Sequence, residues 1–234
     1  MTDLAELTAR LERAGFVAAE EEAAELLAAP GDLEAMVARR LTGEPLAWIT
    51  GTAPFCGLWI RVDPGVYVPR WQTEALARRA VERLPADGVA IDLCTGSGAI
   101  ATVLSTHRPH ARVLGSDIDP KAVACARSNG VEAYEGDLFE PLGDIVADVI
   151  VGVVPYVPTP DLPLLQRDTF TFEAPLAYDG GADGLDIVRR VVAEAPRHLR
   201  GSLLLEIGGE QAAAFSGDPI LDEEGDVRGI EIRT

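Results

Sequence analysis

The sequence predicts an α/β protein with a doubly wound, mostly parallel sheet. Strand-like and helix-like segments alternate from residue 89 onward, which is the pattern of such a sheet. The segment Val89–Leu93 is a short apolar run that is typical of a strand buried on both faces. A glycine-rich loop at 94–98 and an apolar helix start follow it directly. We expect the sheet to be organised around this strand, loop and helix.

Residues 1–45 predict a small N-terminal helical domain. Asp3 can cap a first helix that ends at Gly15, and two further helices are expected near 17–29 and 32–43. The acidic run at 20–22 is interpreted as a solvated helix face. Helices this short bury little apolar surface, so we expect the domain to pack against its neighbour or against a partner.

Residues 46–70 are interpreted as a β-hairpin that links the helical domain to a main domain at 71–234. The stretches AWITG, FCGLWIRV and GVYVPR are rich in β-branched and aromatic residues, and glycine or proline separates them. Trp48, Phe55 and Trp59 are expected in the hydrophobic core, because large aromatic side chains contribute most when they are buried.

In the main domain, a helix near 71–84 is expected to precede the sheet. The predicted strands lie near 89–93, 112–117, 131–134, 147–153, 202–207 and 227–233, and the predicted helices lie near 99–107, 119–128 and 184–198. Ligands of such a sheet bind beyond the carboxyl ends of its strands. The connection 158–184 is long and has little periodicity, and its aromatic and acidic residues predict a lid that faces a substrate.

The loop after the first central strand is suited to a nucleoside-containing ligand. Gly96 and Gly98 lack side chains, so a ligand can approach the backbone amides at the helix N-terminus. Asp117 ends the next predicted strand, at the usual place of a carboxylate that holds a ribose. The glycines also match the dinucleotide pattern G-x-G-x-x-A, so NAD is an alternative cofactor.

Three further features favour S-adenosylmethionine over NAD. Asp92 lies inside the strand end before the glycine loop, where it can face a cationic methionyl group. Asp137 follows a third strand and can accept a hydrogen bond from an adenine amino group. A fourth strand runs straight into Val154-Pro155-Tyr156. Strand-end acids followed by a Pro-Tyr loop are typical of class I methyltransferases.

A series of motifs extends this pattern over nearly the whole chain: DLCTGSG, SDIDP, GDLFEPL, DVIVGVVPYVP, FEAPLAYDGGADG and LLLEIG. In order and spacing they resemble the HemK/PrmC family. The resemblance implies a class I methyltransferase (Rossmann-like) fold, S-adenosylmethionine as methyl donor with S-adenosylhomocysteine as product, and methylation of a glutamine side-chain amide in peptide-chain release factors. It assigns cofactor binding to Asp92, Cys94, Thr95, Gly96, Ser97, Gly98, Asp117, Ile118, Asp137 and Leu138.

The resemblance also implies a catalytic tetrapeptide, which here reads Val153, Val154, Pro155 and Tyr156 where the family has Asn-Pro-Pro-Tyr. In the family, the asparagine oxygen and the next carbonyl accept the two N–H bonds of the amide, and the tyrosine packs against it. Val153 supplies no acceptor. Another nucleophile, an acceptor from the lid, or cofactor binding without turnover would each explain the change. The candidates that face the substrate from the lid and linker are Arg70, Glu173 and Asp179.

The composition limits the possible partners. A net charge of −18, from 38 acidic and 20 basic residues, repels a phosphate backbone, so we expect no nucleic-acid partner. Three isolated cysteines and three scattered histidines predict no metal site. The N-terminus does not resemble a signal peptide and no apolar run is long enough to span a membrane, so we expect a cytoplasmic protein without a membrane partner.

The most direct hypothesis is therefore a methyltransferase whose partner is a protein that resembles a release factor. Val153 keeps two alternatives open. The acceptor can be a small molecule or another protein side chain, or the chain can be a non-catalytic module that binds S-adenosylmethionine and regulates a partner.

Overall fold

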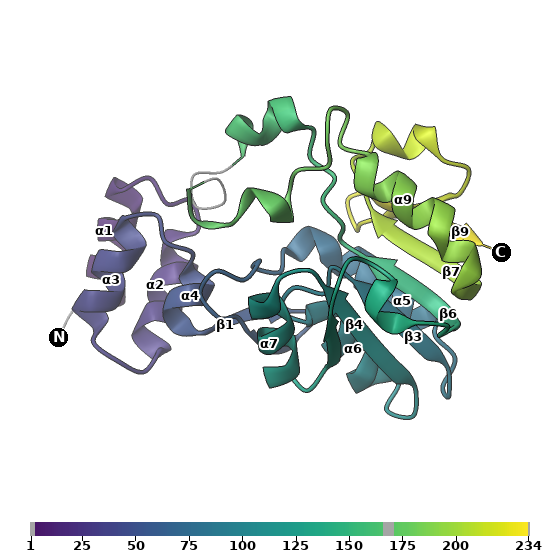
Figure 1. Cartoon of the computed structure of the whole chain (residues 1–234). Coiled ribbons are helices and arrows are strands. Elements are labelled where there is room, and N and C mark those ends of the chain that lie inside the picture. Colours follow the sequence, from purple (N-terminus) through teal and green to yellow (C-terminus); the bar gives the residue numbers. More distant parts are fainter. Residues whose placement is uncertain (1–2, 166–170, 234) are drawn as a thin grey trace.

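The computed structural model describes residues 3–165 and 171–233, and a large mixed sheet lies at its centre (Figure 1). The strands of this sheet in the described ranges are β3 (Val89–Leu93), β4 (Arg112–Asp117), β5 (Glu132–Glu135), β6 (Ala147–Gly152), β7 (Leu199–Glu206), β8 (Asp218–Leu221) and β9 (Val227–Arg233). Their order is β5-β4-β3-β6-β7-β9-β8. β9 runs antiparallel to β7 and β8, whereas the other neighbours are parallel.

The strand order reverses at the centre of the sheet. The chain leaves β3 for β4 and β5 on one side and later returns to β6 on the other side of β3. Such a switch point opens a crevice beyond the carboxyl ends of the two central strands, and ligands bind there. The predicted doubly wound sheet is thus confirmed, and the end of β6 lies beside the glycine-rich loop that follows β3.

Helices cover both faces of the sheet. The apolar layer on one face contains residues of α5 (Glu74–Arg83), α6 (Ala99–His107) and α7 (Pro120–Ser128). The layer on the other face contains residues of α9 (Asp186–Glu194), η2 (Glu140–Leu142) and η5 (Ala195–Arg197). Neighbouring strand residues enter opposite layers, as Ala90 and Ile91 do, because side chains alternate across a strand.

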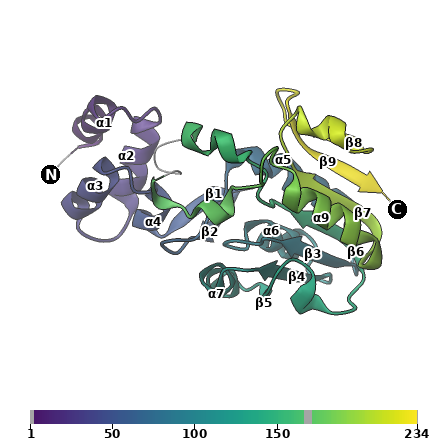
Figure 2. The same ribbon diagram turned by 45° about the horizontal axis from the view of Figure 1, so that its top comes forward.

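The N-terminal helices lie together at one end of the molecule, apart from the sheet (Figure 1, Figure 2). They are α1 (Leu4–Arg13), α2 (Ala19–Ala28), α3 (Leu33–Leu41) and α4 (Leu46–Thr50). Their apolar side chains form a cluster of their own around Leu11 and Leu26. Glu22 is not part of a solvated face as predicted, because the buried Arg40 of α3 binds its carboxylate at 2.6 Å.

The linker differs from the predicted hairpin at both of its ends. β1 (Thr52–Phe55) and β2 (Leu58–Arg61) do form an antiparallel pair. The stretch AWITG is helical instead, because Trp48 is buried in α4 and donates its indole N–H to the Val66 carbonyl at 2.9 Å. The stretch GVYVPR is not a strand.

Of the three predicted core aromatics of the linker, two are in the core. Trp48 and Phe55 are buried, but Trp59 is 65 % exposed. Trp59 and its neighbour Ile60 lie on opposite faces of β2, and only the face with Ile60 packs against the main domain.

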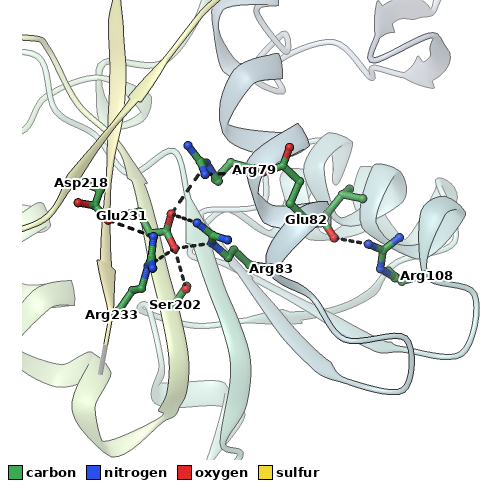
Figure 3. Close-up of polar contacts among 9 residues, drawn as sticks. Arg79, Glu82, Arg83, Arg108, Ser202, Asp218, Glu231 and Arg233 are labelled. Atoms are coloured by element: carbon green, nitrogen blue, oxygen red, sulfur yellow. Dashed lines mark hydrogen bonds and ion pairs between the residues drawn. The ribbon is translucent and has the colours of Figure 1, made fainter.

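β8, which the sequence analysis did not predict, is an edge strand, a place where its Pro219 is tolerated. The adjacent β9 is tied to α5 by Glu231, a nearly fully buried carboxylate (Figure 3). Arg83, Ser202 and Arg233 donate hydrogen bonds to it at 2.6, 3.0 and 2.9 Å. Burial raises the pKa of Glu231, but these donors outweigh burial and lower it to about 2. The resulting stabilisation is present above pH 4.5 and is lost as the pH falls through about 2.

The remaining short helical turns lie in the connections: η1 (Trp71–Thr73), η3 (Thr159–Leu164), η4 (Pro175–Ala177) and η6 (Gln211–Ala214). Among the residues that the structure describes, none of the helices has the length and apolar character needed to cross a bilayer.

Candidate functional site

Two adjoining cavities lie at the carboxyl edge of the sheet. The first, which we call the loop cavity, is lined by nine of the ten residues assigned to cofactor binding: Asp92, Cys94, Thr95, Gly96, Ser97, Asp117, Ile118, Asp137 and Leu138. The second, the tyrosine cavity, is lined by Tyr67, Tyr156 and Tyr178 together with Arg70, Val153, Val154, Glu206 and Arg228. Tyr67, Val153 and Ala177 line both cavities. The two cavities therefore share a wall.

Gly98 is the assigned residue that does not line the loop cavity, and it has a packing role. Its φ is +79°, and a Cβ on it would lie 2.8 Å from the Val131 side chain and 3.2 Å from the backbone of Ala126. Only glycine lets the helix start pack this closely against α7 and against Val131, the residue before β5. Gly96 has a φ of +55° and more room, since its nearest neighbour would be 3.8 Å away.

Asp117 bridges the end of β4 and the glycine loop. Its Oδ2 accepts a hydrogen bond from the Gly96 N–H at 2.9 Å, and its Oδ1 accepts one from the Asp119 N–H at 2.9 Å. Burial raises the pKa of Asp117. The cap of α7 is Asp119, which accepts from the Lys121 N–H. Asp117 thus serves the loop and the cavity rather than the following helix.

Asp92 fixes the other side of the loop. Its Oδ2 accepts hydrogen bonds from the Thr95 hydroxyl at 2.7 Å and from the Ala101 N–H at 3.2 Å. Burial raises the pKa of Asp92 to about 7, so a cation in the loop cavity would stabilise its ionised form. Cys94 and Leu138, also in the wall, adopt φ values of +53° and +51°. Such strained non-glycine backbone is concentrated at functional sites.

Asp137 meets a basic partner that the sequence analysis did not single out. Arg190 of α9 contacts its Oδ2 at 2.6 Å, and both residues line the loop cavity. No local sequence pattern predicts this ion pair, because Asp137 and Arg190 are 53 positions apart.

The predicted catalytic tetrapeptide leaves β6 between the two cavities. Pro155 faces the loop cavity, Val154 and Tyr156 face the tyrosine cavity, and Val153 belongs to both. The Tyr156 hydroxyl donates to Glu206 Oε1 at 2.8 Å. Glu206 ends β7 at the same sheet edge. The motif LLLEIG contains Glu206, so the rule that ligands bind at strand ends could have found it.

The lid is anchored to the linker by Glu173. This buried carboxylate accepts hydrogen bonds from the Val68 N–H at 2.9 Å and from Arg70 at 2.5 Å, and it also contacts the Tyr178 hydroxyl. The structure thus brings Arg70 and Glu173 together at the cavities. Asp179 lines neither cavity and instead accepts from the Thr159 hydroxyl and the Gly181 N–H. Phe170, named with the lid, lies outside the described residues.

Comparison with known proteins identifies close relatives of the chain. Residues 58–156 match the family model "Methyltransferase small domain". The release factor glutamine methyltransferase of Geobacter sulfurreducens is 44 % identical over 190 residues, which cover 78 % of this chain and 67 % of that protein. The release factor glutamine methyltransferase of Neisseria gonorrhoeae is 40 % identical over 206 residues, which cover 83 % of this chain and 73 % of that protein.

The solved structures agree on the fold. The ribosomal protein L11 methylase of Lactobacillus delbrueckii superposes with a TM-score of 0.51 at 21 % identity, over 75 % of this chain and 85 % of that one.

Proposed function

Because this chain belongs to the release factor glutamine methyltransferase family, and is a class I methyltransferase that uses S-adenosylmethionine, we propose that it methylates the side-chain amide nitrogen of a glutamine in a peptide-chain release factor. The acceptor is thus a protein side chain and not a free small molecule. A cytoplasmic location belongs to the same proposal, and Cys56, Cys94 and Cys125, all unpaired, support it.

The loop cavity suits S-adenosylmethionine. The buried Asp92 offers a carboxylate to the cationic methionyl end, and Asp117 is available for the ribose hydroxyls at the start of the loop. Ile118 is 52 % exposed although it is apolar, and with Leu138 it offers a surface for a flat ring beside Asp137. When bound, S-adenosylmethionine supplies an activated methyl group for in-line transfer.

The tyrosine cavity is the proposed place of the acceptor amide. An amide nitrogen is a weak nucleophile, so the residues around it must orient its lone pair and exclude water. Tyr156 can pack against the amide plane, and the Val154 carbonyl can accept one N–H bond. The lid contributes Glu173 to the loop cavity and Tyr178 to the tyrosine cavity, and these two side chains contact each other. As the nitrogen gains the methyl group it loses one proton, which passes through its hydrogen-bond acceptor to solvent, and S-adenosylhomocysteine is left.

The observation that most supports the proposal is that the two cavities adjoin and share lining residues. Val153 and Tyr67 line both, so a methyl donor in one cavity and an amide in the other would lie on either side of the same side chains. A cavity that ended at the cofactor would fit a binding module, whereas two adjoining cavities fit transfer between two ligands.

Intact-mass measurement tests the proposal. The protein and S-adenosylmethionine are incubated with release factor from the same source, beside the Val153→Asn variant, and peptide mapping locates the product. We expect a gain of one methyl group on glutamine with both proteins. Methylation by the variant alone would show that the natural acceptor is not an amide. The absence of transfer by either protein, with S-adenosylhomocysteine still bound, would contradict catalysis on release factors.

A further inference from the structure

The tyrosine cavity contains a buried carboxylate that the scheme above does not use. Glu206 is only 5 % exposed and lines this cavity. Its Oε1 accepts the Tyr156 hydroxyl, but its Oε2 has no hydrogen-bond partner among the described residues. Buried polar atoms are nearly always paired, and leaving one unpaired costs free energy. The unpaired oxygen therefore indicates a donor that arrives with a ligand.

The donors around Glu206 do not satisfy this oxygen. The Thr73 hydroxyl lies near the carboxylate and lowers its pKa, but neither Thr73 Oγ1 nor Glu206 Oε2 has a partner at hydrogen-bond geometry among the described residues. Arg228 lines the cavity but binds Asp222 at 2.6 Å. Burial raises the pKa of Glu206, and its neighbours only partly offset this.

The register of the sheet places Glu206 beside Val153, the position of the tetrapeptide that supplies no hydrogen-bond acceptor. β6 and β7 are parallel neighbours, and Gly152 of β6 is in register with Leu205 of β7. Val153 follows Gly152 along the chain, and Glu206 follows Leu205. The apolar side chain of the catalytic tetrapeptide and the unpaired carboxylate are therefore adjacent at one edge of one cavity.

We propose that the Glu206 carboxylate accepts an N–H bond of the acceptor amide, in place of the side-chain oxygen that Val153 does not provide. This inference rests on the proposed function, since it takes the acceptor to be an amide. A carboxylate has about four acceptor positions, of which Tyr156 occupies one, so there is capacity for a further donor. Tyr156 holds the carboxylate in place, and the Val154 carbonyl receives the second N–H bond.

A rescue experiment tests the inference. Rates of methyl transfer to release factor are measured for the wild type, Glu206→Leu, Val153→Asn and the double variant. Removing the acceptor of a buried N–H bond lowers kcat/KM by about 10-fold to 100-fold in Glu206→Leu. Asparagine at 153 restores an acceptor, so the double variant is expected within about threefold of Val153→Asn. A merely structural role of Glu206 would not be rescued in this way.

Two controls support the comparison. Glu210→Leu changes an exposed carboxylate that lines neither cavity, and its rate is expected to equal that of the wild type. Affinity for S-adenosylhomocysteine, measured by calorimetry, is expected to stay unchanged in Glu206→Leu because Glu206 does not line the loop cavity. If the leucine variant does not fold, Glu206→Met, which is unbranched and of similar length, replaces it.

The outcomes separate the inference from the proposed function. A wild type that methylates glutamine, with Glu206→Leu equally active or not rescued by asparagine, overturns the inference alone. A wild type that does not methylate glutamine overturns the proposed function, and with it the assignment of Glu206 to an amide. Loss in Glu206→Leu with rescue in the double variant supports both.

Discussion

The loop cavity and the tyrosine cavity lie at the same sheet edge, yet they are assembled in different ways. The strand ends and turns after β3, β4 and β5 supply one continuous part of the loop cavity, and the linker, the end of β6, the lid and α9 supply the rest. The tyrosine cavity combines the linker, the end of β6, the lid, the end of β7 and β9. The loop cavity thus has one wall built from consecutive strand ends, whereas every wall of the tyrosine cavity depends on distant segments.

The acids of the two cavities differ accordingly. Asp92 and Asp117 accept hydrogen bonds from the glycine loop itself, so their positions are set before any ligand binds. Glu206 keeps one oxygen unpaired. In the function that we propose, the loop cavity is preorganised for the cofactor, and the tyrosine cavity is completed by the acceptor amide. Val153, the departure from the family tetrapeptide, lines both cavities, so a substitution there faces the proposed cofactor as well as the proposed acceptor.

The largest effect on stability is expected from a substitution at Gly98, where the glycine loop packs closely against its neighbours. In Gly98→Ala, the new side chain is strained by the positive φ and its Cβ clashes with Val131 at 2.8 Å. We therefore expect a loss of about 2–4 kcal/mol in the free energy of unfolding. Gly96→Ala has the same kind of φ but open space, so it is expected to lose only about 1–2 kcal/mol. Urea unfolding of both variants measures the difference. Equal losses would contradict the close-packing role of Gly98.

A smaller effect is expected at the predicted lid, whose residues line both cavities. Glu173→Ala removes the acceptor for Val68 and Arg70, so Kd for S-adenosylhomocysteine and KM for release factor should each rise about tenfold. Asp179→Ala alters the same lid away from both cavities and is the matched control. We expect its Kd and KM to change by about twofold. Calorimetry and initial rates provide the data. An effect on KM alone would place the lid on the acceptor side only.

Next in size is the pH dependence of cofactor binding. With a pKa of about 7, Asp92 is mostly neutral at pH 6 and ionised at pH 8. Because the ionised form attracts the cationic methyl donor, affinity should rise about tenfold between these values. Calorimetric titrations with S-adenosylmethionine at several pH values test this. Asp92→Asn should bind more weakly and with a flatter profile, and an unchanged profile would remove Asp92 from the cofactor site.

The smallest effect is expected at the rim of the loop cavity. The ion pair between Asp137 and Arg190 is half exposed, so breaking it with Arg190→Ala should cost less than about 1 kcal/mol of stability. Asp137→Asn should weaken S-adenosylhomocysteine binding by a few-fold at most, because an amide oxygen can still accept a hydrogen bond. Thermal unfolding and calorimetry measure both. A loss above tenfold in Asp137→Asn would show that the charge itself is required.

The sequence predicted those parts of the molecule whose structure is local. The strand Val89–Leu93, the glycine loop and the acids at strand ends were recognisable because each is set by a few consecutive residues. The interpretation of AWITG as a strand was wrong, since Trp48 finds its partner at Val66, outside that stretch. The exposure of Trp59 was missed for a related reason, because only packing decides which face of a hairpin is covered.

The sequence by itself determined the fold class, the glycine loop with its strand-end acids, and the unusual valine at 153, because alternating elements and turn residues act over short distances along the chain. Only the tertiary structure decided what surrounds that valine. The register of β6 and β7 sets Glu206 beside Val153, the lid brings Glu173 to Arg70 across 103 positions, and α9 brings Arg190 to Asp137. Contacts between distant segments depend on how the layers pack, and no local pattern in the chain encodes them.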